Sequence, residues 1–301
     1  MITAKQKTTN RRALSWLLLL AIMLSLALTG CGGTTDPVSN PTEEETTLPA
    51  DVAVEQLAFF NPLPIPEAAS ESGALTLNLS ERAREKHALN SDTVGWLQVP
   101  NTTLDDVIVW YPGDRNAFYL RRNFDKVPNT GPLQTQYGSY FADYRCAFDG
   151  GRQGLARNTV LYGHSMEDDP NGGGFSQLKK YLNEDFAKAN PYIYFSTTDE
   201  EMAWEVFAVF YATIELPYNR PQMTATEFPQ VIGESLKRSV YNYDTDISAE
   251  DKILTLSTCC YNFSTSYPNN YRYVIMAKLV KPGEVLAKEA ALVKNPSPKE
   301  P

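Results

Sequence analysis

The chain has 301 residues, of which 43% are hydrophobic and 11% aromatic, a composition that argues against a collagen-like, fully disordered or multispanning membrane protein. Lys and Arg number 27 against 36 Asp and Glu, and because four basic residues lie in the first thirty positions, the rest carries 23 against 36, a net charge of −13 that argues against nucleic acid as a partner. Four cysteines are too few for a disulfide scaffold, and two histidines leave little for a multi-ligand zinc site. We expect no metal and no cofactor.

Residues 1–30 are predicted to be a targeting segment. A basic stretch precedes the apolar run 13–28, which is slightly short for a bilayer span and fits the core of a signal peptide. The run ends in Leu28-Thr29-Gly30-Cys31, which resembles a bacterial lipobox whose cysteine carries lipid. The alternative is an uncleaved signal anchor, with Cys31 present by chance. Both interpretations place the remainder on the extracytoplasmic face of the cell membrane, lipid-anchored or signal-anchored.

The remaining chain divides into three parts by composition. Residues 31–78 are rich in Thr, Pro and Glu and are predicted to be a disordered tether, because proline does not fit inside a helix or a central strand. Residues 79–282 are long enough for one sizeable core and form the predicted folded domain. Residues 283–301 are weakly apolar and are predicted to be a flexible tail.

The predicted domain is rich in strands. Runs of β-branched and aromatic residues alternate with Gly, Pro, Asn and Asp clusters. These runs are residues 94–99, 106–111, 138–142, 159–162, 192–196, 204–213, 252–258 and 272–279. Helices are expected at 79–89, 175–182 and about 226–241, the last from apolar residues at helical spacing. The sum is a mostly antiparallel β domain, with a barrel as one arrangement and helices inserted in its loops.

The chain has two histidines. His87 lies in a polar stretch and is expected to be a solvated helix residue. His164 follows the apolar strand 159–162 and Gly163, so it stands where a strand opens into a Gly-rich loop. Taken alone, His164 would be a loop histidine satisfied by backbone.

A cysteine and an arginine also lie at predicted strand ends. The apolar strand 253–258 runs directly into Cys259, where a substrate can reach the thiol; the thiol attacks as the thiolate and so needs a nearby cation or base. Arg272 begins the next apolar strand. If the two strands pair, its guanidinium lies near the sulfur and can donate to a developing oxyanion. Taken alone, Arg272 would be a surface charge at a strand edge.

Three sequence blocks occur in the order His, Cys, Arg: LYGH at 161–164, TLSTC at 255–259 and YRYVIMAKL at 271–279. Together they resemble the sortase family of cysteine transpeptidases, whose signature is TLxTC with an upstream His and a downstream Arg. Other segments are similar to class B sortases of the Gram-positive cell surface, and the resemblance covers about residues 80 to 281. These segments are DTVGWLQVP at 92–100, NAFYLRRNF at 116–124, GSYFADYR at 138–145 and the helix between 226 and 241.

The resemblance implies a fold and a reaction. The fold is mostly β, a closed eight-stranded sortase-type β-barrel with N-terminal helices and a helix inserted in the loop before the Cys strand. The reaction cleaves a C-terminal sorting motif of a secreted protein. The acyl group passes through a thioester to an amine of a peptidoglycan precursor or of another protein.

The resemblance also implies roles for particular residues. Cys259 would be the nucleophile, His164 would protonate the leaving amine and later deprotonate the incoming one, and Arg272 would hold the substrate carbonyl and its oxyanion. Four residues match stretches that line the substrate groove: Asn116, Leu120, Ser257 and Thr258.

The sequence departs from the family pattern around its other cysteines. Relatives often have a polar or acidic residue after the catalytic cysteine, whereas this chain has Cys260. Strand alternation points Cys260 away from the face of Cys259, so we predict that it packs. A disulfide between Cys260 and Cys146 stays open. Class B sortases usually keep a membrane anchor, so a lipobox at Cys31 would be unusual.

Two other classes of protein fit less well. An L,D-transpeptidase has its His and Cys in one short motif, whereas here positions 164 and 259 are 95 apart, and a papain-like peptidase places Cys before His. A non-catalytic surface lipoprotein that binds a wall ligand has no need of a reactive thiol. The sorting motif, the accepting amine and the oligomeric state are not encoded in any local pattern.

Overall fold

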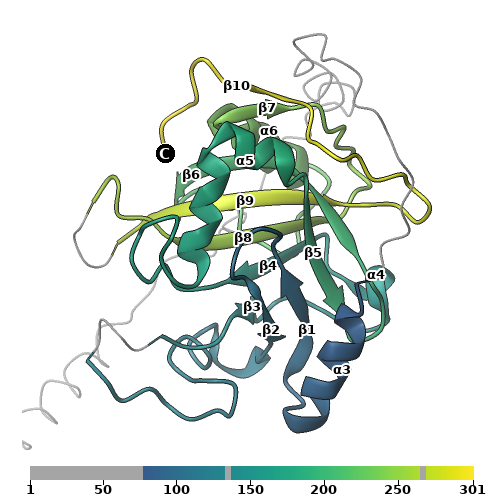
Figure 1. Cartoon of the computed structure of the whole chain (residues 1–301), viewed down its shortest axis with the longest axis vertical. Coiled ribbons are helices and arrows are strands. Elements are labelled where there is room, and N and C mark those ends of the chain that lie inside the picture. Colours follow the sequence, from purple (N-terminus) through teal and green to yellow (C-terminus); the bar gives the residue numbers. More distant parts are fainter. Residues whose placement is uncertain (1–76, 133–136, 265–268) are drawn as a thin grey trace, which may run out of the picture. The chain divides into compact units, whose positions relative to one another are not determined.

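Eight strands close into a barrel in the order β1-β2-β3-β4-β8-β9-β6-β5 (Figure 1). The structure is a computed structural model, and it describes residues 77–132, 137–264 and 269–301. The predicted targeting segment, Cys31 and all but the last two residues of the predicted tether lie outside the described residues. The expected mostly β fold with a closed eight-stranded barrel is confirmed.

The strands and helices are as follows. The barrel strands are β1 (Thr93–Gln98), β2 (Asp105–Val109), β3 (Phe141–Ala142), β4 (Asn158–Tyr162), β5 (Tyr192–Thr197), β6 (Ala203–Thr213), β8 (Ile253–Cys259) and β9 (Tyr271–Leu279). A second, two-stranded sheet pairs β7 (Tyr241–Tyr243) with β10 (Leu292–Lys294). The helices are α3 (Leu79–Leu89), α4 (Gly151–Gly154), α5 (Glu184–Ala189) and α6 (Glu227–Arg238), with the 3-10 helices η1 (Pro112–Asp114) and η3 (Phe175–Leu182).

The barrel is antiparallel except at two pairs of strands. β2 and β3 run parallel, and so do β4 and β8. β8 therefore has a parallel neighbour on one side and the antiparallel β9 on the other. Because parallel neighbours end at the same edge, the carboxyl ends of β4 and β8 meet at one end of the barrel.

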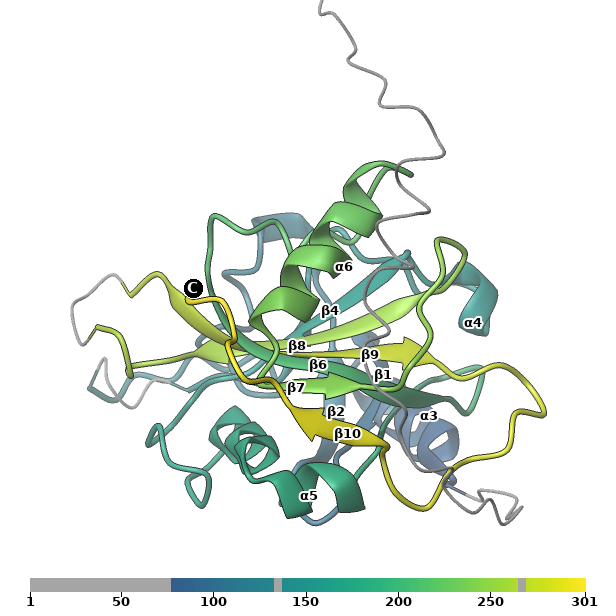
Figure 2. The same ribbon diagram turned by 90° about the horizontal axis from the view of Figure 1, so that it is seen from above.

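Side chains of β8 and β9 alternate between two apolar environments. Leu254 and Leu256 face the barrel interior, and they pack there with Tyr273 and Ile275 of β9. The opposite, outer face is covered by α6, which Figure 2 shows beside this part of the barrel. The apolar side chains of α6 repeat at helical spacing and are buried on that face: Phe228, Val231 and Ile232. β8 is thus buried on both faces up to Thr258, and Cys259 is its first partly exposed residue.

The helix predicted over 226–241 is shorter in the structure. α6 ends at Arg238, and Ser239 has a non-helical backbone with ψ of 134°. Two bonds to β6 make the chain leave the helix there: the hydroxyl of Ser239 accepts the N–H of Val209 at 3.1 Å, and Val240 donates to the Val209 carbonyl at 2.8 Å. Pairing with a distant strand therefore overrides the helical pattern.

The C-terminal segment also differs from its prediction as a flexible tail. Residues 292–294 form β10, and Leu292 is buried. Farther along, Asn295 donates to the Val240 carbonyl at 3.0 Å, and the ammonium of Lys299 lies 2.6 Å from Glu234 of α6. The polar composition gave no sign of this short strand, which is fixed by the burial of Leu292 and by its backbone pairing with β7.

Candidate active site

Cys259 and Arg272 face each other across two neighbouring strands. Cys259 is the last residue of β8, and the antiparallel register makes Arg272 its direct partner on β9. Directly opposite residues of an antiparallel pair project to the same face, with Cβ atoms about 4.5–5.5 Å apart. The predicted pairing of these two strands is confirmed, and the thiol and the guanidinium share the outer face.

The strand that leads to His164 lies on the other side of β8. The parallel register pairs Asn158 with Ile253 and Tyr162 with Ser257, so each residue of β4 lies level with the one 95 positions later. The hydroxyl of Thr258 continues this register by donating to the Gly163 carbonyl at 2.7 Å. The strand register itself ends at Tyr162 and Ser257. We infer that its continuation by two residues brings His164 level with Cys259.

The imidazole of His164 is held in one tautomer. Its Nε2 lies 2.7 Å from the carbonyl oxygen of Leu120. A carbonyl only accepts, so Nε2 carries the hydrogen, and in the neutral ring Nδ1 has the free lone pair. The ring of Tyr137 packs beside it, with centroids 5.3 Å apart. Burial lowers the pKa of His164; the bond to Leu120 opposes this, and the charge of Arg121 adds to the lowering.

The guanidinium of Arg272 is fixed by backbone carbonyls at the start of β9. Its Nη1 donates to the carbonyls of Asn269 at 2.6 Å and of Tyr271 at 2.8 Å. These bonds restrict the side chain near its own backbone, while its charge stays at the face that Cys259 shares.

The three described cysteines lie in different environments. Cys259 is partly exposed, whereas Cys260 has no exposed surface and packs in the interior cluster, as alternation predicted. The thiol of Cys260 donates to Oδ1 of Asn262 at 3.4 Å, and burial raises its pKa. Burial also raises the pKa of Cys146, to about 12. Cys146 and Cys260 are both free thiols, so the structure has no disulfide between them.

Tyr218 is a component of the site that the sequence did not reveal. Its hydroxyl is 3.0 Å from the hydroxyl of Ser257, on the face of β8 that carries Cys259. Burial raises the pKa of Tyr218 to about 12. The positive charge of Arg272 opposes this increase, and negative charge at Cys259 adds to it. Its loop is fixed to the barrel by Asn158, which donates to the Tyr218 carbonyl at 2.8 Å. The only sequence signal was a tyrosine in a proline-flanked loop.

Three of the four predicted substrate-binding residues lie directly at this site. Leu120 holds His164 through its carbonyl, while Ser257 and Thr258 are each 2% exposed and already hydrogen-bonded within the protein. Asn116 is linked to the site only indirectly, because its amide donates to the buried carboxylate of Asp143 at 2.9 Å. A role of these residues in binding substrate stays a prediction.

Asp143 connects Asn116 to the strand that leads to His164. It accepts the hydroxyl of Tyr162, at the end of β4, at 3.0 Å, and it forms an ion pair with Arg145 at 2.8 Å. Burial by itself would raise the pKa of Asp143, but the bonds from Arg145 and Asn116 outweigh burial and keep the pKa below its ordinary value. This carboxylate is therefore a structural anchor of the loops beside the site.

The described ranges contain neither a candidate metal site nor a helix able to span a membrane. Among residues 77–132, 137–264 and 269–301, no three His, Cys, Asp or Glu side chains are grouped so as to hold a metal ion. In the same part of the chain, no helix has the length and apolarity that a membrane crossing requires.

Comparisons with known proteins agree with this geometry. A family model described as "Sortase domain" matches residues 133–280. Sortase B of Listeria monocytogenes is 32% identical over 71% of this chain and 82% of its own length, and sortase B of Staphylococcus aureus is 29% identical over 64% and 72%.

Solved structures of the same class also match. A structure described as a Staphylococcus aureus sortase B-substrate complex has a TM-score of 0.56 and 27% identity, covering 68% of this chain and 87% of that one. Clostridium perfringens sortase B has a TM-score of 0.55 and 28% identity, covering 66% and 99%. Neither a different cysteine enzyme nor a non-catalytic lipoprotein is supported. With the barrel and its order of His, Cys and Arg, these matches show that the chain belongs to the sortase family, as a class B cysteine transpeptidase.

Proposed function

We propose that Cys259, His164 and Arg272 together carry out the transpeptidation. The observation that carries this proposal is the double register of β8. Arg272 lies opposite Cys259 on one side, and on the other side β4 runs parallel to β8 up to Tyr162 and Ser257, two residues before His164 and Cys259. A nucleophile, an acid–base group and a fixed cation at one strand end are the parts that acyl transfer through a thioester requires.

In the first half of the reaction, the thiolate of Cys259 attacks the carbonyl carbon of the scissile peptide bond. The C–S bond forms while the carbonyl oxygen becomes negative and lies against Arg272. When the C–N bond breaks, the leaving amine takes a proton from His164. Since Nε2 is engaged with Leu120, Nδ1 is the nitrogen that we assign to this transfer.

In the second half, an incoming amine attacks the thioester. Nδ1 of His164 takes the proton from that amine, the C–S bond breaks, and the thiolate of Cys259 is regenerated. Because burial lowers the pKa of His164, the imidazole is mostly neutral at pH 7, so the imidazolium and thiolate pair is a minor fraction of the resting enzyme.

The family acts on sorting-motif substrates at the cell surface. For this chain we propose a C-terminal motif of a secreted protein as acyl donor and an amine of a peptidoglycan precursor or of another protein as acceptor. The reaction uses no metal in this proposal, so a chelator should leave turnover unchanged. A chelator-sensitive rate would contradict that point.

Attachment to the membrane is proposed through the N-terminus, either by lipid on Cys31 or by an uncleaved signal anchor. A flexible tether of about 47 residues has a root-mean-square span of about 35–40 Å, enough to lift the site clear of the headgroups. Mass spectrometry of the native protein distinguishes the two anchors. Lipidation gives a diacylglyceryl cysteine and a chain without residues 1–30, whereas an intact N-terminus supports the anchor.

The experiment that tests the catalytic proposal is capture of the thioester. Sorting-motif peptides are incubated with the enzyme, quenched in acid and digested, and the peptide containing residues 259 and 260 is analysed by fragmentation. We expect the acyl mass on Cys259, its release by hydroxylamine, and the same adduct in Cys260→Ala. An adduct on Cys260, or none on Cys259 while cleavage proceeds, would refute the assignment.

A further inference from the structure

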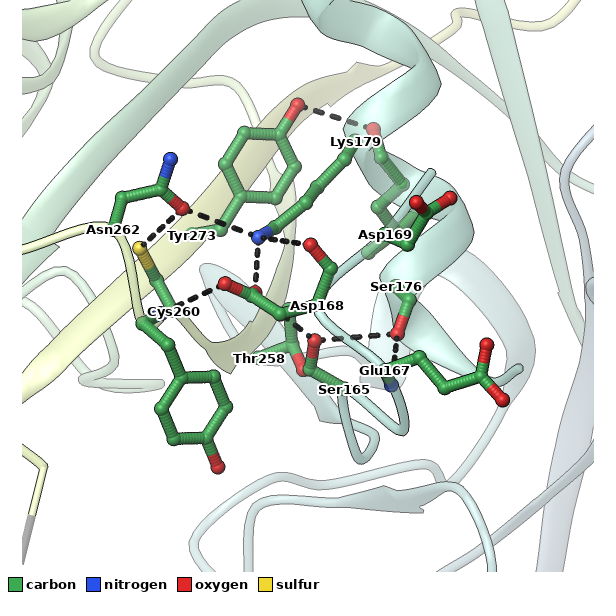
Figure 3. A network of polar contacts seen from close by, with 12 residues as sticks. Ser165, Glu167, Asp168, Asp169, Ser176, Lys179, Thr258, Cys260, Asn262 and Tyr273 are labelled. Atoms are coloured by element: carbon green, nitrogen blue, oxygen red, sulfur yellow. Dashed lines mark hydrogen bonds and ion pairs between the residues drawn. The ribbon is translucent and has the colours of Figure 1, made fainter. Parts of the chain in front are cut away.

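A nearly buried ion pair lies directly behind the site, on the inner side of β8 (Figure 3). Lys179 of η3 is 4% exposed, and its ammonium contacts the carboxylate of Asp168 in the loop that follows His164. The same ammonium is 3.3 Å from the carbonyl of Asp168 and 3.3 Å from Oδ1 of Asn262. The catalytic steps proposed above use none of these groups.

This ion pair connects the two segments that carry the proposed acid–base group and nucleophile. Asp168 comes four residues after His164, and its Oδ2 accepts the backbone N–H of Tyr261 at 3.1 Å. Tyr261 comes two residues after Cys259. The loop after His164 is therefore fastened to the chain immediately after the nucleophile, and Figure 3 shows Lys179, Asp168 and Asn262 converging beside Cys260.

The loop that presents Asp168 is itself held in place. Ser165 forms an isolated β-bridge with Gly174, and its hydroxyl lies 3.3 Å from Asp168 and 3.2 Å from the hydroxyl of Ser176. The backbone of Asp168 has φ of +51°, a left-handed conformation that aspartate tolerates better than most residues. That conformation is part of the turn that brings the carboxylate to both Lys179 and the segment after Cys259.

Stability alone does not account for charges in this position. A buried ion pair gives little net stability, because desolvation offsets the attraction, and apolar residues of similar volume often do as well or better. Buried ionic groups have a better-attested use in fixing register and geometry. Here the geometry at stake is the separation of His164 and Cys259, which each proton transfer and each attack of the proposed reaction depend on.

We propose that Lys179 and Asp168 are positioning residues that fix the loop after His164 against the segment after Cys259 and so set the separation of imidazole and thiol. This inference rests on the proposed roles of those two residues. A misplacement of about 1 Å at reacting groups costs about 10²-fold in rate. Loss of the ion pair should therefore lower kcat much more than it raises KM.

The test uses a variant without a stranded buried charge, Asp168→Asn with Lys179→Met. Asparagine keeps an acceptor for Tyr261 and tolerates a positive φ, and methionine keeps most of the lysine stem. With a sorting-motif peptide, we expect kcat to fall about 10- to 100-fold while KM changes less than about threefold. The matched control is Lys180→Met, which makes the same change at the exposed neighbour that donates to the Asn101 carbonyl, and it should keep wild-type kcat.

The split between kcat and KM separates positioning from a merely structural role. A variant that is only partly folded loses active molecules, so its kcat falls in proportion to the folded fraction that circular dichroism measures. A displaced imidazole instead lowers kcat per folded molecule and leaves KM nearly unchanged. Wild-type kcat in a double variant with native circular dichroism would overturn the proposal, and so would a fall in kcat that only matches the loss of folded protein.

Two further variants complete the design. Lys179→Arg alone keeps the positive charge, so its kcat should lie much closer to that of the wild type than to that of the double variant. A kcat as low as that of the double variant would count against an ion pair as the cause. Cys259→Ala tests the catalytic assignment separately. If Cys259→Ala retains turnover, the proposed roles fail, whereas an inactive Cys259→Ala beside a fully active Asp168→Asn, Lys179→Met variant refutes positioning alone.

Discussion

Cys259 and Cys260 are consecutive residues with the same side chain, yet they lie in opposite surroundings. Cys259 is partly exposed and faces Arg272 on the outer face of β8. Cys260 has no exposed surface, packs in the interior cluster, and has a pKa raised by burial. A thiol attacks as its thiolate, which burial disfavours. The comparison teaches that the pleat of the strand, rather than the residue type, decides which thiol can react.

The largest contrast should come from the two cysteines themselves. We expect Cys259→Ala to abolish cleavage of sorting-motif peptides and leave the unfolding free energy nearly unchanged. Cys260→Ala should keep cleavage and lose about 1 kcal/mol of stability, a usual cost for a buried substitution. Peptide cleavage and urea unfolding measure the two effects. Equal loss of activity in both variants, with native circular dichroism, would contradict the claim that only the thiol on the outer face of β8 reacts.

The next contrast is between Arg272 and its neighbour on β9. Arg272→Ala should lower kcat/KM about 10²-fold or more, mostly through kcat, because it removes a cation from the developing oxyanion. Arg272→Lys keeps the charge without the planar fork and should stay impaired. Steady-state kinetics decide this: unchanged kcat with a raised KM would mean that Arg272 merely anchors the substrate.

The matched change on the inner face is Tyr273→Phe. The hydroxyl of Tyr273 donates to the Leu178 carbonyl at 3.1 Å inside the fully buried core. Its removal leaves a buried acceptor without that bond and should cost about 1–3 kcal/mol of unfolding free energy. Cleavage below the unfolding transition should stay near wild type. A loss of kcat as large as that of Arg272→Ala would show that the inner face takes part in chemistry.

A smaller effect is expected where Tyr218 contacts Ser257 on the outer face. Tyr218→Phe removes one hydrogen bond of 3.0 Å and leaves the ring packed. We expect kcat/KM to fall about threefold to tenfold, which corresponds to the net value of about 0.5–1.5 kcal/mol for such a bond. Ser257→Ala removes the same bond from the other side and should behave alike. Effects that add fully in the double variant would show that the two hydroxyls do not act together.

The smallest expected effect is on the pH dependence of stability. The pKa of His164 is lowered in the folded protein, so between that value and about 6.5 the unfolded chain binds more protons. The unfolding free energy therefore rises with pH through this window, and the contribution of His164 is lost as the pH falls. In His164→Gln, the fall in Tm between about pH 8 and about pH 5 should be smaller than in the wild type. An equal fall in both would mean that His164 titrates normally.

Much of the site could be predicted from the sequence because local blocks carry it. Cys259 and His164 each follow an apolar run and Arg272 begins one, and the pairing of β8 with β9 follows from the succession of these two strands. Tyr218 could not be predicted, since its contact with Ser257 depends on a loop folding back onto β8. Strand alternation, a period of two residues, was enough to assign Cys260 to the interior.

Other features depended on partners distant in sequence. The hydrogen bond from His164 to Leu120 involves a backbone carbonyl, which leaves no signature in the side chains. The strand β10 was overlooked because its pairing with β7 outweighs a polar composition. The ion pair of Lys179 and Asp168 was equally hidden, since charged residues in a loop and a short helix are usually solvated. Tertiary contacts, rather than local propensity, determine all three.

The alternation along β8 also has a consequence for the fidelity of the fold. A slip of β8 by one residue against its neighbours would exchange the two faces and turn the thiol of Cys260 outward. The same slip would carry Thr255 and Ser257 into the apolar interior, away from Asn158 and Tyr218, and each unpaired hydroxyl would cost about 1–3 kcal/mol. These hydroxyl-bearing residues of the outer face therefore help to hold the register, so that a chain with two adjacent thiols presents the same one to its substrate.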